Sequence, residues 1–122
     1  MISVDVMDQV GAKPATFLAS VAFDDSEIFS ARELIAARVK HEFEKLRFHD
    51  EFDPVRSAIY GDLPITAGIS HAEMTRRAIA GFSNRRFLLF VDGRQISGLE
   101  EVVRLLPDTK VKFLRLTQLQ GG

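Results

Sequence analysis

The stretch that decides the fold lies at residues 86–96 and reads Arg86-Phe87-Leu88-Leu89-Phe90-Val91-Asp92-Gly93-Arg94-Gln95-Ile96. Its first half is almost continuously apolar, which is typical of a strand that is covered on both faces. Asp92-Gly93 is a strong signal for a tight hairpin turn. A strand at residues 86–91 and a shorter partner strand at residues 94–96 are therefore predicted.

The chain on the C-terminal side predicts one further strand and a tail. Residues 99–106 are expected to make one or two helical turns, which Pro107 would stop. Residues 111–116 are expected to form the last strand. Residues 117–122 then form a polar tail that carries Gly121 and Gly122.

The N-terminal side predicts a second hairpin. Residues 2–8 alternate between apolar and polar side chains, which is the period of a half-buried strand. Residues 9–15 contain Gly11 and Pro14 and indicate a turn, and residues 16–23 indicate the second strand. Because this hairpin and the following helix form a crossover, the first and last strands are expected to pair in parallel at the centre of the sheet.

A helix over residues 31–46 has the clearest pattern in the chain. Ser30 and Glu33 match a capping box, in which each side chain satisfies a backbone N–H group of the other residue. Apolar residues recur at steps of three and four and predict one buried stripe, namely Ala31, Leu34, Ile35, Val39, Phe43 and Leu46. The opposite, solvent-facing side is predicted to be charged and to hold Arg32, Arg38, Lys40, Glu44 and Lys45.

Residues 48–83 form a predicted excursion from the sheet. Residues 48–69 lose periodicity and carry Asp, Pro and Gly residues, which indicates a loop. A second capping box, Ser70 with Glu73, opens a shorter helix that is predicted to reach about Phe82.

Composition bounds the class of protein. The 122 residues, 46% of them hydrophobic, suit a single α+β domain at residues 1–116 with one mixed sheet and one core. A net charge of −1 favours neither nucleic acid nor an anionic membrane as a partner, and a cytoplasmic location is expected. The chain has no Cys, and His41, His49 and His71 lack metal-ligand spacing. We therefore expect no metal site, no cofactor and no catalytic activity of its own.

Two groups of residues leave alternatives open at this point. Phe90 either points into the core or belongs to an exposed apolar patch, and the outer face of its strand is covered either by a partner or by the helix after Ser70. The arginines at 76–77 and 85–86 form the main basic concentration. They indicate either a solvated face or a surface that binds phosphate or acidic groups.

The predicted order of strands and helices resembles that of ubiquitin and the β-grasp fold. Residues 90–96 resemble the strand and turn of ubiquitin that hold Gly, Lys, Gln and Leu, and residues 99–102 stand where ubiquitin has its short helix. Residues 111–122 resemble its last strand and its Leu-Arg-Gly-Gly ending. Residues 48–83 have no ubiquitin counterpart. The resemblance implies a β-grasp fold with an inserted loop and short helix.

For function, the resemblance implies a protein modifier similar to the bacterial ubiquitin-like proteins. An E1-like adenylating enzyme would activate the carboxylate of Gly122, and an isopeptide bond to a target protein would follow. An E2-like conjugating enzyme and a deconjugating peptidase are implied as further partners. Gly121 and Gly122 have no Cβ, so their backbone fits a narrow channel.

The residues that such partners would contact are also implied. Recognition by the activating enzyme falls on Leu119, Gln118, Leu116 and Arg115. No arginine stands at the position that matches the one read in ubiquitin, which favours a dedicated activating enzyme. The apolar partner patch of ubiquitin corresponds here to Phe90 with Leu114. Two alternatives remain: a β-grasp sulfur carrier that ends in a thiocarboxylate, and a non-covalent ubiquitin-like binding module.

Overall fold

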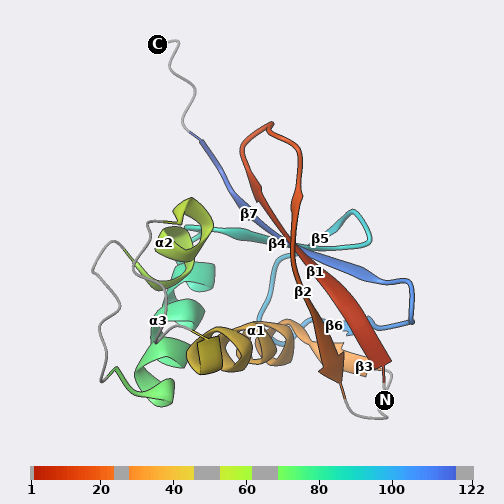
Figure 1. Cartoon of the computed structure of the whole chain (residues 1–122), viewed down its shortest axis with the longest axis horizontal. Helices are drawn as coiled ribbons and strands as arrows, with labels where there is room; N and C mark the ends of the chain where they lie inside the picture. Colours follow the sequence, from red (N-terminus) through yellow and green to blue (C-terminus); the bar gives the residue numbers. More distant parts are fainter. Residues whose placement is uncertain (1, 24–27, 46–52, 62–68, 118–122) are drawn as a thin grey trace.

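The computed structural model describes residues 2–23, 28–45, 53–61 and 69–117, and these residues form an α+β fold (Figure 1). A hairpin and a short strand come first, the helices follow, and the remaining strands complete the chain. The predicted α+β class with a mixed sheet and one main helix is confirmed.

A five-stranded mixed sheet has its strands in the order β2-β1-β7-β4-β5. The first and last strands, β1 and β7, lie side by side in parallel, as predicted, and every other neighbouring pair in this sheet is antiparallel. This order is compatible with a β-grasp-like arrangement. The bounds are β1 Ile2–Val10, β2 Thr16–Phe23, β4 Leu88–Val91, β5 Arg94–Ile96 and β7 Lys110–Arg115.

The ends of the strands differ from the prediction where pairing extends or stops. β1 continues to Val10, inside the predicted turn, because Gln9 and Val10 pair with Leu114 and Arg115 of β7. β7 ends at Arg115 and not at residue 116. The turn between β1 and β2 therefore begins at Gly11, whose φ of +53° suits glycine better than other residues.

The predicted helical turns at residues 99–106 are wrong. Val102–Arg104 forms strand β6, which pairs antiparallel with β3, Ile28–Ser30, in a separate two-stranded sheet. The carbonyls of Leu99 and Glu101 accept hydrogen bonds from Arg32 and Ala31, the first backbone N–H groups of the main helix. A segment whose carbonyls bind the free N–H groups at the start of a helix is held extended beside that helix, whatever the segment's own helix propensity.

The main helix, α1, spans Ala31–Lys45, and the predicted capping box at its start is confirmed. Ser30 Oγ accepts from Glu33 N at 3.2 Å, while a Glu33 carboxylate oxygen accepts from Ser30 N at 3.0 Å. Two residues of the predicted stripe differ from expectation: Phe43 is 41% exposed, and Leu46 lies outside the described residues. The buried residues of α1 are Ala31, Leu34, Ile35, Arg38, Val39 and Glu42.

The predicted loop at residues 48–69 is wrong for its central part. Pro54–Tyr60 forms helix α2, with Asp53 as its N-cap and Gly61 after its last residue. Asp53 Oδ1 accepts from Val55 N at 2.9 Å and from Arg56 N at 3.0 Å. Seven residues are too few for a clear apolar period, although Asp53, Pro54 and Gly61 are ordinary start and stop residues.

Helix α3, His71–Ser83, confirms the helix predicted after Ser70, whose hydroxyl accepts from Glu73 N at 3.0 Å. Figure 1 shows α1, α2 and α3 gathered on one side of the five-stranded sheet. α3 packs on α1 and α2, and its buried residues belong to the same core as those of the sheet. α3 therefore helps to cover the face of the sheet that carries the helices. Within the described residues, no helix is both long and apolar enough to cross a membrane.

Candidate functional site

The predicted conjugation residues, Gly121 and Gly122, lie outside the described residues, and so do Gln118 and Leu119. The described part of the tail reaches Thr117. Residues 115–117, which we call the tail root, are the last residue of β7 and the two described residues that follow it. Leu116, a predicted recognition residue, is 57% exposed. The tail root therefore leaves an apolar side chain accessible next to the end of the central sheet.

Two hydrogen bonds and one close contact hold the tail root. The backbone N–H of Gly11 donates to the Arg115 carbonyl at 2.8 Å, and Arg115 Nη1 donates to the Pro54 carbonyl at 2.9 Å. Thr117 lies against Gly11 so closely that a Cβ at position 11 would be 2.6 Å from its Oγ1. Arg115, expected to contact the activating enzyme, is thus already bound to α2 within the domain.

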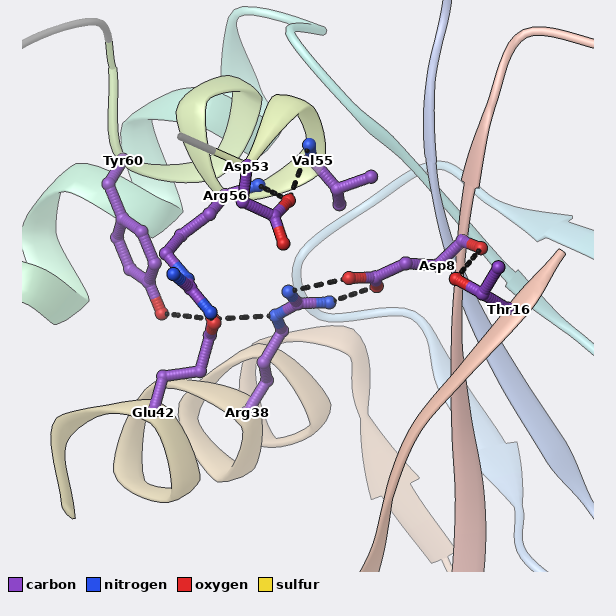
Figure 2. Close-up of polar contacts among 8 residues, drawn as sticks. All are labelled: Asp8, Thr16, Arg38, Glu42, Asp53, Val55, Arg56 and Tyr60. Carbon is purple, nitrogen blue, oxygen red and sulfur yellow. Dashed lines mark hydrogen bonds and ion pairs between the residues drawn. The ribbon is translucent and has the colours of Figure 1, made fainter. Parts of the chain in front are cut away.

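A buried network of charged side chains lies beneath this region (Figure 2). Arg38 of α1 forms a bidentate pair with Asp8 of β1, and its Nε donates to Glu42 Oε1 at 2.8 Å. The same carboxylate accepts from Tyr60 Oη at 2.9 Å and, through Oε2, from Arg56 Nε at 2.8 Å. The network thereby joins β1, α1 and α2.

The prediction that Arg38 lies on a solvated face is wrong. Its side chain is 1% exposed, and that of Glu42 is 3% exposed. A buried charge is tolerated only when it is paired and hydrogen-bonded. Arg38 meets both carboxylates with its guanidinium fork and also lies over the ring of Phe113, at 4.7 Å from the ring centroid. Pairing on both sides allows a cation at a position where an apolar residue is usual.

Burial and pairing act in opposite directions on the pKa values of these groups. Burial raises the pKa of Asp8, and Arg38 offsets the rise only in part. Burial also acts to raise the pKa of Glu42, but Arg38 and Arg56 outweigh it and leave that pKa below its ordinary value. Burial and then the Glu42 carboxylate hold the pKa of Tyr60 well above its usual range. Tyr60 therefore remains a phenol that donates to Glu42 at neutral pH.

A crevice opens between the β1–β2 hairpin and the start of α2, close to the tail root. Its polar side chains are Asp8, Lys13, Thr16 and Asp53, and its apolar lining comes from Val10, Pro14, Phe17, Leu18, Pro54 and Val55. Asp8 is occupied by Arg38, and Asp53 caps α2. These two carboxylates are therefore engaged in holding the domain together.

The predicted partner residues Phe90 and Leu114 lie on the sheet face opposite the helices. Their neighbours in sequence, Leu89 and Phe113, are buried in the core, and side chains alternate between the faces along each strand. Lys112 pairs with Phe90 across the strands, with its Nζ at 5.2 Å from the ring centroid. The alternative in which α3 covers this face is wrong, because α3 packs on the other side.

The arginines at 76–77 and 85–86 are largely used within the fold. Arg76 and Arg77 pair with Glu73 at 2.6 and 3.2 Å, and these hydrogen bonds lower the pKa of Glu73 to about 2. Arg86 donates to the carbonyls of Ala58 and Arg77 and so links the end of α2 to α3. Arg76 remains 68% exposed at its side chain, which agrees with a solvated face.

The buried network is the feature that sequence reasoning missed, although a signal for it exists. Arg38 and Glu42 follow Leu34 and Ile35 at helical spacing and lie on the apolar stripe. Oppositely charged residues four apart on such a stripe indicate an internal ion pair. Within the described residues, no group of three or more His, Cys, Asp or Glu side chains is placed to hold a metal ion.

Comparison with known proteins gives no relative from which to assign a function. No family model matches the chain, no curated protein matches it, and no solved structure matches it.

Proposed function

We propose that this protein is a ubiquitin-like modifier that is joined to a target protein through the carboxylate of Gly122. The observation that supports the proposal is the position of the Gly121-Gly122 pair in the sequence, shortly after the last strand. β7 is flanked by β1 and β4 in a sheet compatible with a β-grasp, and the tail that carries both glycines follows directly from it.

The chemistry of the proposal needs an enzyme to activate the carboxylate. An E1-like adenylating enzyme forms an acyl adenylate at Gly122 from ATP and releases pyrophosphate. An enzyme thiolate then displaces AMP to give a thioester, and a target amine displaces the thiolate to give an isopeptide bond. Glycine at both positions allows the close backbone approach that a narrow catalytic channel requires.

The open sheet face supports a protein partner as well. Phe90 and Leu114 are partly exposed there, and Lys112 gives the same surface a positive charge. Aromatic and aliphatic side chains at a flat, accessible surface are typical anchors of protein interfaces. We assign this surface to contact with the activating enzyme or an E2-like conjugating enzyme.

The decisive experiment is the recovery of conjugates from source cells that express the protein with an N-terminal affinity tag. Purification under denaturing conditions is followed by trypsin digestion and mass spectrometry. Arg115 is the last basic residue of the chain, so trypsin leaves residues 116–122 attached to the acceptor amine. Branched peptides that carry this remnant are expected for the full chain and are expected to disappear when Gly122 is deleted.

Gln120→Ala is the matched control, because it alters the tail and keeps both glycines. Intact-mass analysis of the same samples distinguishes the alternatives. Replacement of one carboxylate oxygen by sulfur identifies a sulfur carrier. Partners that are recovered only without denaturant, and equally well after deletion of Gly122, identify a non-covalent binding module.

A further inference from the structure

Helix α2 lies between the buried charge network and the tail root and contacts both. Pro54, its first residue, accepts the hydrogen bond from Arg115, while Arg56 and Tyr60 bind Glu42. Ubiquitin has no counterpart of this part of the chain. An inserted helix has therefore been placed where it touches the segment that leads to Gly122.

Polar contacts and strand pairing form a closed circuit that connects β1, α1, α2 and β7. Asp8 of β1 is the register partner of Phe113 in β7, two positions before Arg115. From Asp8 the contacts run through Arg38 and Glu42 to Arg56 in α2. Pro54 then returns the circuit to Arg115 of β7. The first turn of α2 is thus fixed relative to the strand that carries the tail, and its last residue, Tyr60, is held through Glu42.

The cost of the network argues for a role in orientation. Removing charges from water is expensive, and apolar residues of similar size often stabilise a fold as well as a buried ion pair does. A charged network, however, accepts only arrangements in which every partner meets its donor or acceptor. The network therefore fixes the position of α2 more precisely than apolar packing alone.

We propose that α2 is a dock that sets the direction in which the tail leaves the domain, with Arg115 as a positioning residue. This inference rests on the proposed function of the tail. Arg115 is bound at both its carbonyl and its guanidinium. Leu116, exposed and next in the chain, is then the first tail residue available to an activating enzyme.

The first test needs no partner protein and measures the order parameters of the Leu116 and Thr117 amides by nitrogen-15 NMR relaxation. Arg115→Met removes the hydrogen bond to Pro54 and keeps the apolar stem, whereas Arg115→Lys keeps one donor. Arg56→Met loosens α2 without altering any residue of the tail root. Arg94→Met, at an exposed arginine of β5, is the matched control.

Lower order parameters at both amides are expected in Arg115→Met and Arg56→Met, with near-normal values in Arg115→Lys and Arg94→Met. Unchanged order parameters in Arg115→Met overturn the inference. A decrease in Arg115→Met but not in Arg56→Met also overturns it. The tail root would then be ordered by one hydrogen bond that does not depend on the contacts of α2 with the network.

The second test uses the activating enzyme recovered through the Gly122 conjugates and follows ATP–pyrophosphate exchange. Arg115→Met is expected to raise KM for this protein about fivefold, the equivalent of one hydrogen bond, and to leave kcat unchanged. A loss of kcat with unchanged KM contradicts a positioning role. If the order parameters change as expected but no conjugate or adduct forms with any variant, the dock stands and the proposed modifier function fails.

Discussion

Arg38 is the residue on which the buried network depends, since it bridges Asp8 and Glu42 from a position that is 1% exposed. Asp8 has its second carboxylate oxygen at 3.0 Å from Nη2, so both oxygens are occupied. Replacing Arg38 leaves two buried carboxylates, of which Glu42 keeps Arg56 and Tyr60 as partners and Asp8 loses its ion pair.

Arg38→Met is therefore expected to lower the free energy of unfolding by about 3–5 kcal/mol, the usual cost of leaving a buried charge without its partner. Urea unfolding followed by circular dichroism measures the loss. Arg32→Met is the matched control on the same helix. Its ion pair with Glu100 is exposed, so a change of less than about 1 kcal/mol is expected. Equal losses in the two variants contradict the importance of the network.

Tyr60 offers a direct measurement, because it is the only tyrosine and the chain has no Trp. Its phenolate absorbance is expected to appear at higher pH than that of an ordinary tyrosine, since burial and Glu42 raise its pKa. An unfolded chain ionises this group near pH 10 while the folded one keeps the proton. The free energy of unfolding should therefore fall as the pH rises beyond about 10. Tyr60→Phe should reduce this alkaline loss, and an ordinary titration curve in the native protein would refute the prediction.

At the scale of elements, the contact between α2 and α3 depends on the absence of a side chain at Gly81. A Cβ there would lie 2.5 Å from the Ile59 carbonyl oxygen and 3.1 Å from that of Ala58. Both are backbone atoms of α2, which cannot turn aside as a flexible side chain can. The close packing of α3 on α2 therefore depends on glycine at this position of α3.

Gly81→Ala is expected to destabilise the protein by about 1–3 kcal/mol through this overlap, although alanine favours an isolated helix. Gly98→Ala is the control, because nothing lies within 4 Å of a Cβ at that position. Thermal unfolding of both variants measures the difference. A stabilised Gly81→Ala protein would show that α2 does not approach α3 this closely.

At the scale of the whole molecule, the sheet separates a helix-bearing face that holds the core from an open face that holds Phe90, Lys112 and Leu114. A change on the open face should affect partners much more than folding. This separation makes the predicted partner patch testable without unfolding the protein.

Phe90→Ser is expected to change the free energy of unfolding by less than about 1.5 kcal/mol, because the ring lies outside the core, and to reduce the yield of Gly122 conjugates in source cells. Val102→Ser is the control, since Val102 is 57% exposed on β6, in the separate two-stranded sheet. Normal conjugation by a folded Phe90→Ser protein removes the patch from the proposed mechanism. Loss of conjugation in both variants shows that the effect is not specific to the patch.

Local patterns were sufficient for most elements of the fold. The capping box at Ser30 starts α1, the N-cap Ser70 starts α3, and the turn at Asp92-Gly93 separates β4 from β5. These signals depend on residues that are neighbours in the sequence. The parallel pairing of β1 with β7 was also predictable, because a hairpin followed by a covering helix leaves few ways for the chain to return.

The features that the sequence predicts wrongly depend on contacts between residues that are far apart in the chain. Val102–Arg104 is a strand because it pairs with β3, and because the carbonyls of Leu99 and Glu101, just before it, accept from the first N–H groups of α1. α2 is a helix too short to show its period. Neither reason is local to the segment concerned. The charge of Arg38 predicts a solvent-facing position, because Asp8 meets it only once β1 and α1 are packed together, although Glu42 lies one turn further along the same helix.

The sequence by itself determined the α+β class, the position of the main helix, the two hairpins and the Gly121-Gly122 pair after the last strand. Tertiary structure alone decided that Arg38 is buried, that α2 contacts the tail root and that Arg115 binds Pro54. The physical reason is the range of each interaction. Caps, turns and apolar periods act between residues a few positions apart, whereas the burial of a charge depends on partners that folding brings from distant parts of the chain.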